Sequence, residues 1–368
     1  MSPYAHITGW GMAVPPRVLT NADLEKIVDT DDEWIKSRTG ISQRHVVSEE
    51  ESTATLARDA ALNALRVANL NPADLELIIV STSTPEHIFP ATACLVQDRI
   101  GASRAGAFDL SAACSGFIYA LNMASQAIRS GSVQNALVIG AETLSRFVNW
   151  EDRNTCVLFG DGAGAFVLQA GDETGGVLSA VMRSDGSGAD LLSLPAGGSR
   201  LPASPETLFN KQHTIHMNGR EVYRFATRVI AQATREVVSS ADLKMEDLQL
   251  VIPHQANLRI IETAMRELEI PPEKCFINIE RYGNTSTASI PIAACEAIQQ
   301  GRLRAGDNTV LVGFGAGLTW GATLVRWTGP FLPQRHIYPT SYQVWVAIRS
   351  RLLRIMRRIE GWIWGRNI

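Results

Sequence analysis

An internal repeat constrains the fold of this 368-residue chain more than any other feature of its sequence. The segment LNPADLELIIV (70–80) matches LKMEDLQLVIP (243–253), and NALVIG (135–140) matches NTVLVG (308–313), both at an offset of 173 residues. One chance match would mean little, but matches that keep their order and spacing indicate two halves of one duplicated fold.

The repeat also relates residues that can carry chemistry. Between the two matches, residues 111–131 align with 281–301 at an offset of 170, which places Cys114 and Asn284 at equivalent points where a turn enters a helix. The offset of 173 puts His254 just past the end of a strand. Because ligands collect beyond the carboxyl ends of strands in α/β sheets, we expect these three side chains to converge near the junction of the halves.

Short apolar runs alternate with longer segments of helical character, which predicts an α/β fold. The runs interpreted as buried strands are Leu77–Val80, Ala136–Ile139, Leu250–Ile252 and Thr309–Val312. Hydrophobic residues make up 45% of the chain and charged residues 19%, as in an ordinary globular protein. The net charge of −3 gives no signature of nucleic-acid binding.

The N-terminal sequence and the cysteines indicate the compartment. MSPYAHITGW lacks the basic region and apolar core of a secretory signal, and no run of 18 apolar residues is present to span a membrane. The cysteines are odd in number and form no CxxC pair, so we expect free thiols in a reducing cytoplasm. Four of them are interpreted as core residues, namely Cys94, Cys156, Cys275 and Cys295.

Cys114 has a different setting from the other cysteines. In GAFDLSAACSGFIYAL (106–121), a strand-like run meets small residues and then a helix, an arrangement that exposes a side chain on a tight turn. The unpaired N–H groups of a helix N-terminus favour a thiolate over a thiol. A thiolate attacks thioesters readily and is a good leaving group afterwards, so Cys114 is the candidate nucleophile.

His254 in VIPHQANLRI (251–260) and Asn284 in RYGNTSTASIP (281–291) complete a Cys–His–Asn set with Cys114. A histidine or an asparagine taken alone is more often a polar side chain with a structural role, satisfied by hydrogen bonds. A papain-like protease also has such a set, but no cysteine-protease signature surrounds Cys114 and the duplicated α/β pattern argues against that fold.

Together these segments resemble β-ketoacyl-acyl carrier protein synthase III, the initiating condensing enzyme of the thiolase superfamily. The AAC turn, PHQANLRI, RYGNTS and GFGAGLTWG (313–321) occur in the family's order, and the resemblance covers roughly residues 1–328. It implies a thiolase-like duplicated fold, with two similar halves in layers of the form α/β/α/β/α. The halves are expected at 1–172 and 173–328.

The resemblance also implies the reaction. Cys114 would be acylated by an acyl-CoA, while His254 and Asn284 would support decarboxylation of malonyl carrier protein and stabilise the enolate oxygen. Such an oxygen needs fixed donors, such as an imidazole N–H and an amide NH₂. The acyl oxyanion would be bound by backbone N–H groups of the nucleophile and of the loop Gly315, Ala316 and Gly317. Ala316 replaces a glycine of some relatives, which matters if that position needs a positive φ.

Other positions are assigned from the same resemblance. The segment TDDEWIKSRTG (30–40) is similar to a coenzyme A binding stretch, in which Trp34 would stack on adenine and Arg38 would hold phosphate. The full set expected to bind coenzyme A is Thr30, Trp34, Arg38, Arg153, Gly219 and Asn257. No tightly bound cofactor is expected, because the coenzyme A thioester is a substrate. Core packing is the alternative for Trp34.

An acyl pocket and a homodimer are implied as well. Leu144 and Phe159 would line the pocket, although core packing explains both equally well. Phe89, in EHIFPATAC, would reach across the dimer to close the pocket of the partner subunit. Its bulk favours short acyl groups, whether acetyl or small branched ones.

Acyl carrier protein is the expected protein partner. Carrier proteins are acidic, so a basic patch would raise the encounter rate. Arg259 and Arg266 are seven residues apart on one predicted helix and therefore share a face. The residues expected to dock the carrier protein are Gln255, Ala256, Asn257, Leu258, Arg259, Arg224 and Arg266. A solvated helix face is the alternative.

The resemblance stops after Trp327. Prolines at 330, 333 and 339 predict a linker over 329–340, and residues 341–368 then show helical spacing of apolar residues. The apolar positions are Trp345, Ile348, Leu352, Ile355, Ile359 and Trp362, and Arg351, Arg354 and Arg358 fall on another face. Such a basic amphipathic helix is suited to a peripheral position on an anionic membrane surface. Packing on the enzyme, binding of a protein partner or a non-conserved appendage are alternatives.

Several other functions are compatible with parts of the sequence. A paralogue that makes a specialised ketide or joins two acyl chains would use the same three residues. A membrane-tethered scaffold without activity is disfavoured by the complete Cys–His–Asn set, and a degradative thiolase by the absence of a cysteine in GFGAG. FGDGAG (159–164) lacks the ending of a P-loop and is interpreted as a turn before a strand. No metal is expected, since His213 and His216 lack a recognisable ligand motif.

Overall fold

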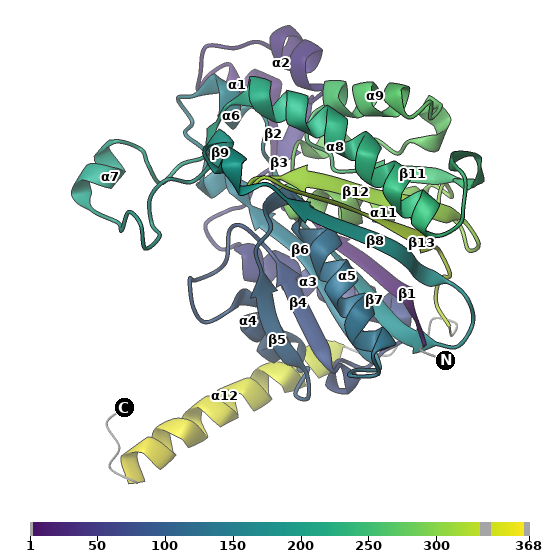
Figure 1. Cartoon of the computed structure of the whole chain (residues 1–368). Helices are drawn as coiled ribbons and strands as arrows, with labels where there is room; N and C mark the ends of the chain where they lie inside the picture. Colours follow the sequence, from purple (N-terminus) through teal and green to yellow (C-terminus); the bar gives the residue numbers. More distant parts are fainter. Residues whose placement is uncertain (1–2, 332–339, 364–368) are drawn as a thin grey trace.

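Two sheets form the centre of the protein, and the computed structural model describes residues 3–331 and 340–363 of the chain (Figure 1). The first sheet has the order β1 (Tyr4–Ala13), β7 (Asp161–Gly171), β6 (Asn135–Thr143), β4 (Leu77–Ser81) and β5 (Gly106–Leu110). The second has the order β11 (Leu250–Pro253), β12 (Asn308–Gly315), β13 (Thr319–Arg326) and β8 (Gly176–Ser184). The four strands predicted from apolar runs are confirmed as β4, β6, β11 and β12.

The two sheets share one pattern of strand directions. In the first, β1, β7 and β6 are antiparallel neighbours, while β4 runs parallel to both β6 and β5. In the second, β8, β13 and β12 are antiparallel neighbours and β11 runs parallel to β12, with a parallel bridge from Val251 to Cys275 in the place of a fifth strand. The boundary between halves at residue 172 stays a prediction, although it falls between β7 and β8.

Helices form the remaining layers (Figure 1). On the outer face of the first sheet lie α3 (Thr53–Ala68) and α4 (Thr92–Ile100), and between the sheets lie α5 (Gly116–Arg129) and α11 (Ser289–Gln299). On the outer face of the second sheet lie α8 (Gly219–Ser240) and α9 (Leu258–Glu267). All nine residues of β6 are buried, because helices cover both faces of this sheet. The predicted α/β class and its layers are confirmed.

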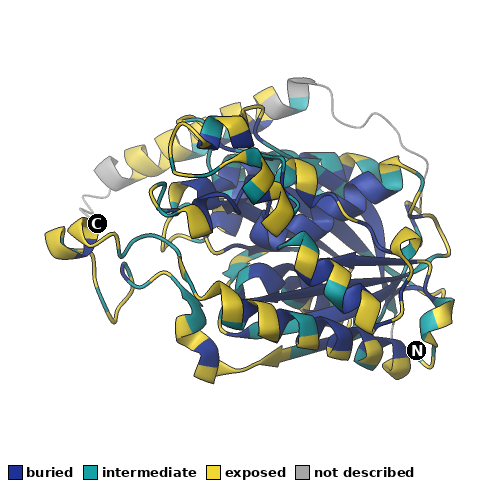
Figure 2. Ribbon diagram, turned by 90° about the horizontal axis from the view of Figure 1, so that it is seen from above, coloured by how far each residue is buried: buried dark blue, intermediate teal, exposed yellow. Residues whose placement is uncertain are grey.

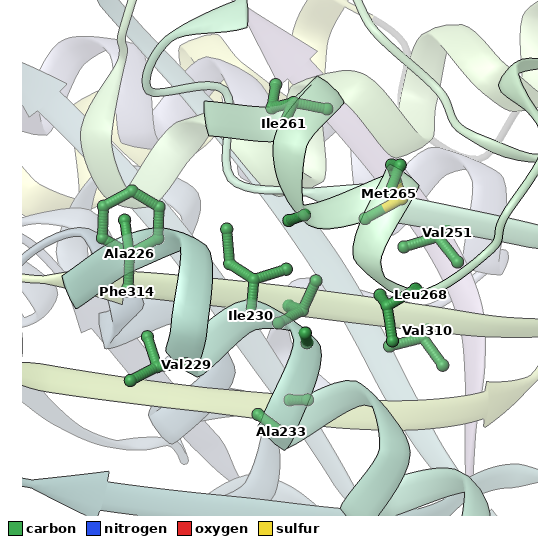
Figure 3. Packing of buried hydrophobic residues seen from close by; sticks show 14 of the residues in the cluster. Ala226, Val229, Ile230, Ala233, Val251, Ile261, Met265, Leu268, Val310 and Phe314 are labelled. Carbon is green, nitrogen blue, oxygen red and sulfur yellow. The ribbon is translucent and has the colours of Figure 1, made fainter. Parts of the chain in front are cut away.

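The outer helices of the second sheet show how a helix is fixed in this fold. Val229 and Ile230 of α8 and Met265 of α9 meet Val310 and Phe314 of β12 in one buried apolar cluster (Figure 3). Burial of a large aliphatic or aromatic side chain contributes about 1.5–3 kcal/mol. The cluster therefore holds in place the segments that begin α8 and α9, which both border the site described below.

Shorter elements complete the fold. The small strands are β2 (Val18–Thr20), β3 (Gln43–His45), β9 (Leu192–Ser193) and β10 (His216–Met217). The small helices are α1 (Asn21–Leu24), α2 (Asp32–Thr39), α6 (Arg153–Cys156), α7 (Pro205–Phe209) and α10 (Ile279–Tyr282). FGDGAG proves to be more than a turn, because β7 already begins at Asp161 and its glycines pair within the sheet.

The last described element is α12 (Thr340–Ile363), which packs beside α4. Figure 2 shows that much of the helix leading to the C-terminus is exposed. Most of the predicted linker, with Pro333 and Pro339, lies outside the described residues, as do the side chain of Trp362 and residues 364–368. Within the described part of the chain, no helix is both long and apolar enough to cross a membrane.

All five cysteines are free thiols. Cys156, Cys275 and Cys295 are buried as expected. The interpretation of Cys94 as a core residue is wrong, because Cys94 is exposed on α4, where its thiol faces the backbone oxygen of Ala107 at 3.6 Å.

Candidate functional site

The turn that carries Cys114 lies between β5 and α5. A single 3₁₀ turn, Ala113–Ser115, precedes α5, and Cys114 at its centre is only 8% exposed. Ala113 has a φ of +47°, in the left-handed region that is unfavourable for residues with a β-carbon. Backbone strain of this kind is retained where the surroundings fix the conformation, as they do around many functional side chains.

The glycine loop lies directly against this turn. A β-carbon on Gly315 would come within 2.6 Å of the backbone nitrogen of Cys114, so only glycine allows this approach. Gly317 has a φ of +131°, whereas Ala316 has no positive φ and its methyl group therefore causes no left-handed strain. The substitution that the sequence left in question is compatible with the loop.

His254 follows β11 and is fully buried. Its Nδ1 lies 2.7 Å from Oγ of Ser289, and the backbone N–H of Gln255 approaches the same oxygen at 3.3 Å. A hydroxyl can accept from Gln255 and donate to Nδ1 at the same time, and in that tautomer the imidazole proton of His254 lies on Nε2. Burial lowers the pKa of His254 to about 3, so the ring is neutral at physiological pH.

Asn284 is held by the strand-like segment that leads into β7. Its backbone N–H donates to the backbone oxygen of Leu158 at 2.8 Å, and its backbone oxygen accepts from the backbone N–H of Gly160 at 3.0 Å. The side-chain oxygen accepts from the backbone N–H of Ser286 at 2.8 Å. Because Oδ1 is occupied in this way, the Nδ2 amide group is the part of the side chain left to donate to a ligand.

Glu142, which the sequence analysis missed, lies behind the site on β6. Its carboxylate accepts from Thr84 Oγ1 at 2.7 Å, from Ser286 Oγ at 3.0 Å and from the backbone N–H of Ser83 at 3.1 Å. Burial raises the pKa of Glu142 to about 7, although these hydrogen bonds act in the opposite direction. The signal in the sequence was an acidic residue within the apolar strand NALVIGAET (135–143).

The ionisation of Cys114 differs from the expectation. Burial raises the pKa of its thiol to about 12, the interaction with Ser286 offsets part of this shift, and the nearby Glu142 adds to it. Burial thus acts in the direction opposite to that expected from the helix N-terminus and favours the neutral thiol in the free protein. The thiol must lose its proton as the reaction proceeds.

One cavity of about 460 Å³ brings the predicted set together. Cys114, His254 and Asn284 all line it, with Gly315 beside them. The same cavity extends to Trp34 and Arg38 of α2. Its wall also includes residues that the sequence did not single out, among them Asn154, Met217, Arg220 and Tyr223.

Trp34 lies between two guanidinium groups, those of Arg38 at 5.0 Å and Arg153 at 5.1 Å from the ring. Such cation–π contacts bring an aromatic ring and two guanidinium groups together at one place. Gly219 and Asn257 also line the cavity, and Asn257 donates from Nδ2 to the backbone oxygen of Arg38 at 3.0 Å. Thr30 is not part of the lining.

A second, smaller cavity of about 110 Å³ also has Cys114 in its lining. Leu144 and Phe159 line it, together with Ala316. The structure does not bring Phe89 into this group, because its side chain is 84% exposed elsewhere on this chain.

The residues expected to dock a carrier protein separate into two groups. Gln255 and Ala256 are buried, and Gln255 donates to the backbone oxygens of Pro253 and Phe276, so these two residues offer little surface to a partner. Arg224, Arg259 and Arg266 are exposed on α8 and α9. Asn257 and Leu258 are partly exposed.

Within residues 3–331 and 340–363, no group of three or more His, Cys, Asp or Glu side chains is placed to hold a metal ion. His213 is engaged instead with Thr207, whose Oγ1 lies 2.9 Å from its Nε2.

Two family models match the chain. Residues 108–186 match the model described as 3-oxoacyl-[acyl-carrier-protein (ACP)] synthase III, and residues 238–327 match the model of its C-terminal part. These segments contain Cys114, His254 and Asn284.

Curated relatives and solved structures are similar over most of the chain. The β-ketoacyl-[acyl-carrier-protein] synthase III of Roseiflexus sp. (strain RS-1) is 54% identical over 328 residues, which cover 89% of this chain and 100% of that protein. The corresponding protein of Symbiobacterium thermophilum is 56% identical over 321 residues, covering 87% of this chain and 97% of the relative. The crystal structure of 3-oxoacyl-[acyl-carrier-protein] synthase III from Aquifex aeolicus VF5 superimposes with a TM-score of 0.81 at 50% identity, covering 88% of this chain and 100% of that one.

Proposed function

The chain belongs to the β-ketoacyl-[acyl-carrier-protein] synthase III family of the thiolase superfamily, and we propose that Cys114, His254 and Asn284 are the residues with which it carries out its reaction. It is a condensing acyltransferase that initiates fatty acid synthesis. A decarboxylating Claisen condensation joins a short acyl-CoA primer to malonyl-acyl carrier protein and gives a 3-oxoacyl-acyl carrier protein.

One observation carries the assignment of residues, namely that Cys114 lies where two cavities meet. The larger cavity extends from the thiol to Trp34 and Arg38, which suits a long ligand with an aromatic base and phosphates. The smaller one is mostly apolar and suits a short acyl chain. A thioester whose carbonyl carbon reached the thiol would thus place its two halves on opposite sides of Cys114.

In the first step, the sulfur of Cys114 attacks the thioester carbonyl of the acyl-CoA. The bond to the sulfur of coenzyme A breaks, and the proton lost by Cys114 is recovered by the departing coenzyme A thiol. The backbone N–H groups of Cys114 and Ala316 stabilise the oxyanion that forms. Gly315 permits this arrangement, because its missing side chain lets the loop approach the turn.

In the second step, malonyl carrier protein loses carbon dioxide and leaves an enolate. The Nε2–H of neutral His254 and the Nδ2 group of Asn284 donate to its oxygen, so that no base is needed. The enolate carbon then attacks the acyl-Cys114 thioester, and the carbon–sulfur bond to Cys114 breaks. The released thiolate takes up a proton, which restores the resting thiol.

Coenzyme A is held as a substrate, without a tightly bound cofactor. Trp34 stacks on its adenine between Arg38 and Arg153, and Gly219 and Asn257 line the path to the thiol. Thr30 is the weakest assignment, because its Oγ1 is buried without a partner among the described residues and outside the cavity lining.

Acyl carrier protein docks on the exposed arginines of α8 and α9. Arg259 and Arg266 supply the charge, and Arg224 joins them although it also pairs with Glu221 at 2.9 Å. Two chains form a homodimer in which the exposed Phe89 closes the acyl pocket of the other subunit. Contact of residues 341–368 with a membrane surface is a separate proposal.

The test is to incubate the protein with a panel of acyl-CoAs and then with malonyl carrier protein. Mass spectrometry of the intact protein detects the acyl group on Cys114, and chromatography detects the condensed product. We expect acylation by short acyl-CoAs only, and none in Cys114→Ala. Cys156→Ala is the matched control, because it removes a buried thiol that lines neither cavity.

Condensation by Cys114→Ala at the wild-type rate would refute the assignment of the nucleophile. Acylation of Cys156 or another cysteine would do the same, because the acylated residue is identified directly by peptide mapping.

A further inference from the structure

The C-terminal helix α12 has two opposite faces. One face is fixed to α4, where Val346 is 3% exposed and lies so close to Gly101 that a β-carbon there would come within 2.9 Å of it. Ser350 Oγ donates to the carboxylate of Asp98 at 2.6 Å and accepts from Arg354 Nη2 at 2.8 Å. The N-terminal half of the helix is thus held in a defined orientation on the enzyme.

The other face is apolar and uncovered. Its side chains follow each other at spacings of one to four residues on one side of the helix, and each is about half exposed. This apolar stripe consists of Val344, Trp345, Ile348, Leu352, Ile355, Met356 and Ile359. The C-terminal part of α12 extends past the body of the enzyme (Figure 1), and the side chains in the second half of the stripe are exposed.

The charge of α12 differs in sign from that of the whole chain. Residues 340–363 contain five arginines and one glutamate, a net charge of +4, whereas the full chain carries −3. None of these arginines forms an ion pair with another described residue. Arg351 and Arg358 are seven residues apart and therefore border the apolar stripe along one side.

We propose that α12 holds this protein at the surface of an anionic lipid membrane. The apolar stripe inserts at the boundary between headgroups and acyl chains, and the arginines meet the lipid phosphates. A second copy of the chain is the less favourable occupant of the stripe, because two helices of charge +4 would repel each other. The proposal does not rest on the catalytic assignment, since the relative from Roseiflexus sp. matches 328 residues of this chain over its own whole length, and those 328 residues are only 89% of this chain.

The attachment leaves the reaction accessible. The helix lies on the opposite side of the molecule from α2 and α9, which border the larger cavity (Figure 1). Because Val346 and Ser350 fix α12 on α4, the mouth of this cavity points away from the lipid. Coenzyme A thioesters and a carrier protein therefore reach the enzyme from the water side.

The test is flotation of the full-length protein with vesicles of phosphatidylcholine, with and without phosphatidylglycerol. We expect binding that requires phosphatidylglycerol and that weakens with added salt. Two double variants should each reduce the partition coefficient about tenfold or more, namely Ile348→Asp with Leu352→Asp and Arg351→Glu with Arg358→Glu. The control, Arg66→Glu with Arg200→Glu, makes the same change of charge at exposed positions elsewhere and should bind as wild type.

All these variants should retain condensing activity in solution, which separates a failure of this proposal from a failure of the catalytic one. Equal binding to both kinds of vesicle, or binding unaffected by the apolar-stripe variant, would overturn the proposal. Concentration-dependent self-association without vesicles that is abolished by Ile348→Asp with Leu352→Asp would instead show that a second copy covers the stripe.

Discussion

The turns that enter α5 and α11 occupy equivalent places in the repeat, yet they present different chemistry. One presents the thiol of Cys114 and the other the amide of Asn284. Each follows a residue with a positive φ, Ala113 at +47° and Gly283 at +64°. Each is held by the other half of the chain, the first by Gly315 and the second by Leu158. The same backbone turn thus occurs twice with a different side chain at the equivalent position. The groups around each turn determine the chemistry of that side chain.

The difference lies in the groups behind the two turns. Burial and the nearby carboxyl group of Glu142 raise the pKa of the Cys114 thiol and so favour its protonated form. Asn284 is neutral, and its orientation is fixed by one hydrogen bond from Ser286. A nucleophile that changes its charge and a donor that does not therefore stand side by side on one cavity.

The largest expected effect comes from removing the side chain of Asn284 on the second turn while the first turn is left unchanged. Asn284→Ala should lower the rate of condensation about 10²–10³-fold, because it removes a donor to the enolate oxygen. Acyl transfer to Cys114 should remain within a few-fold of wild type. Single-turnover measurement of each half-reaction checks this, with the exposed Asn210→Ala as control. An equal loss of rate in both half-reactions would show that Asn284 does not act in condensation alone.

Glu142 accepts from Ser286 beside the second turn and acts electrostatically on Cys114 in the first, and it should make stability depend on pH. Its pKa is about 7 in the folded protein and 4.5 in the unfolded chain, so the folded state binds the proton more tightly. The resulting stabilisation is complete below the unfolded pKa and is lost as the pH rises through about 7, a change of about 3 kcal/mol at most.

Glu142→Gln should therefore flatten the pH dependence of the free energy of unfolding between about pH 5 and pH 8. Denaturant titrations at several pH values measure this. Glu50→Gln, at an exposed position, should leave the slope of wild type unchanged. The same slope in Glu142→Gln and wild type would mean that the carboxyl group is ionised throughout.

Substitutions at Gly283 and Ala113, which both have a positive φ, should change the free energy of unfolding by different amounts. Gly283 combines φ +64° with ψ −159°, a region open only to glycine, and an added β-carbon would lie 2.9 Å from the oxygen of Leu158. Gly283→Ala should cost about 2 kcal/mol of unfolding free energy or more. Ala113→Gly should change it by less than about 1 kcal/mol, since relief of strain and greater freedom of the unfolded chain oppose each other. Similar losses in both variants would contradict this distinction.

The smallest expected effect concerns the tautomer of His254. Ser289→Ala removes the hydroxyl that donates to Nδ1, so the imidazole proton is no longer confined to Nε2. Condensation should slow about tenfold while acyl transfer to Cys114 is unchanged, in keeping with the usual cost of losing an orienting partner. Nitrogen NMR of labelled histidine reports the tautomer. Retention of the Nε2–H form in the variant would exclude Ser289 as the orienting group.

Much of this protein was accessible from the sequence because the signals are local. Apolar runs located β4, β6, β11 and β12, since a strand covered on both faces must be apolar at successive positions. The repeat then related Cys114 to Asn284, and helical spacing predicted the apolar side of the C-terminal segment. None of these inferences required knowledge of the contacts between residues that are far apart in the sequence.

Only the tertiary structure decided how each polar group is surrounded. The acidity of the Cys114 thiol, the burial of Gln255 and the role of Glu142 depend on neighbours far away in the chain, such as Ser286 at 144 positions from Glu142. The sequence determined which residues could react and on which turns they lie. Burial and hydrogen bonding across the fold determined their protonation and direction, because the free energy of a charge depends on everything that replaces water around it.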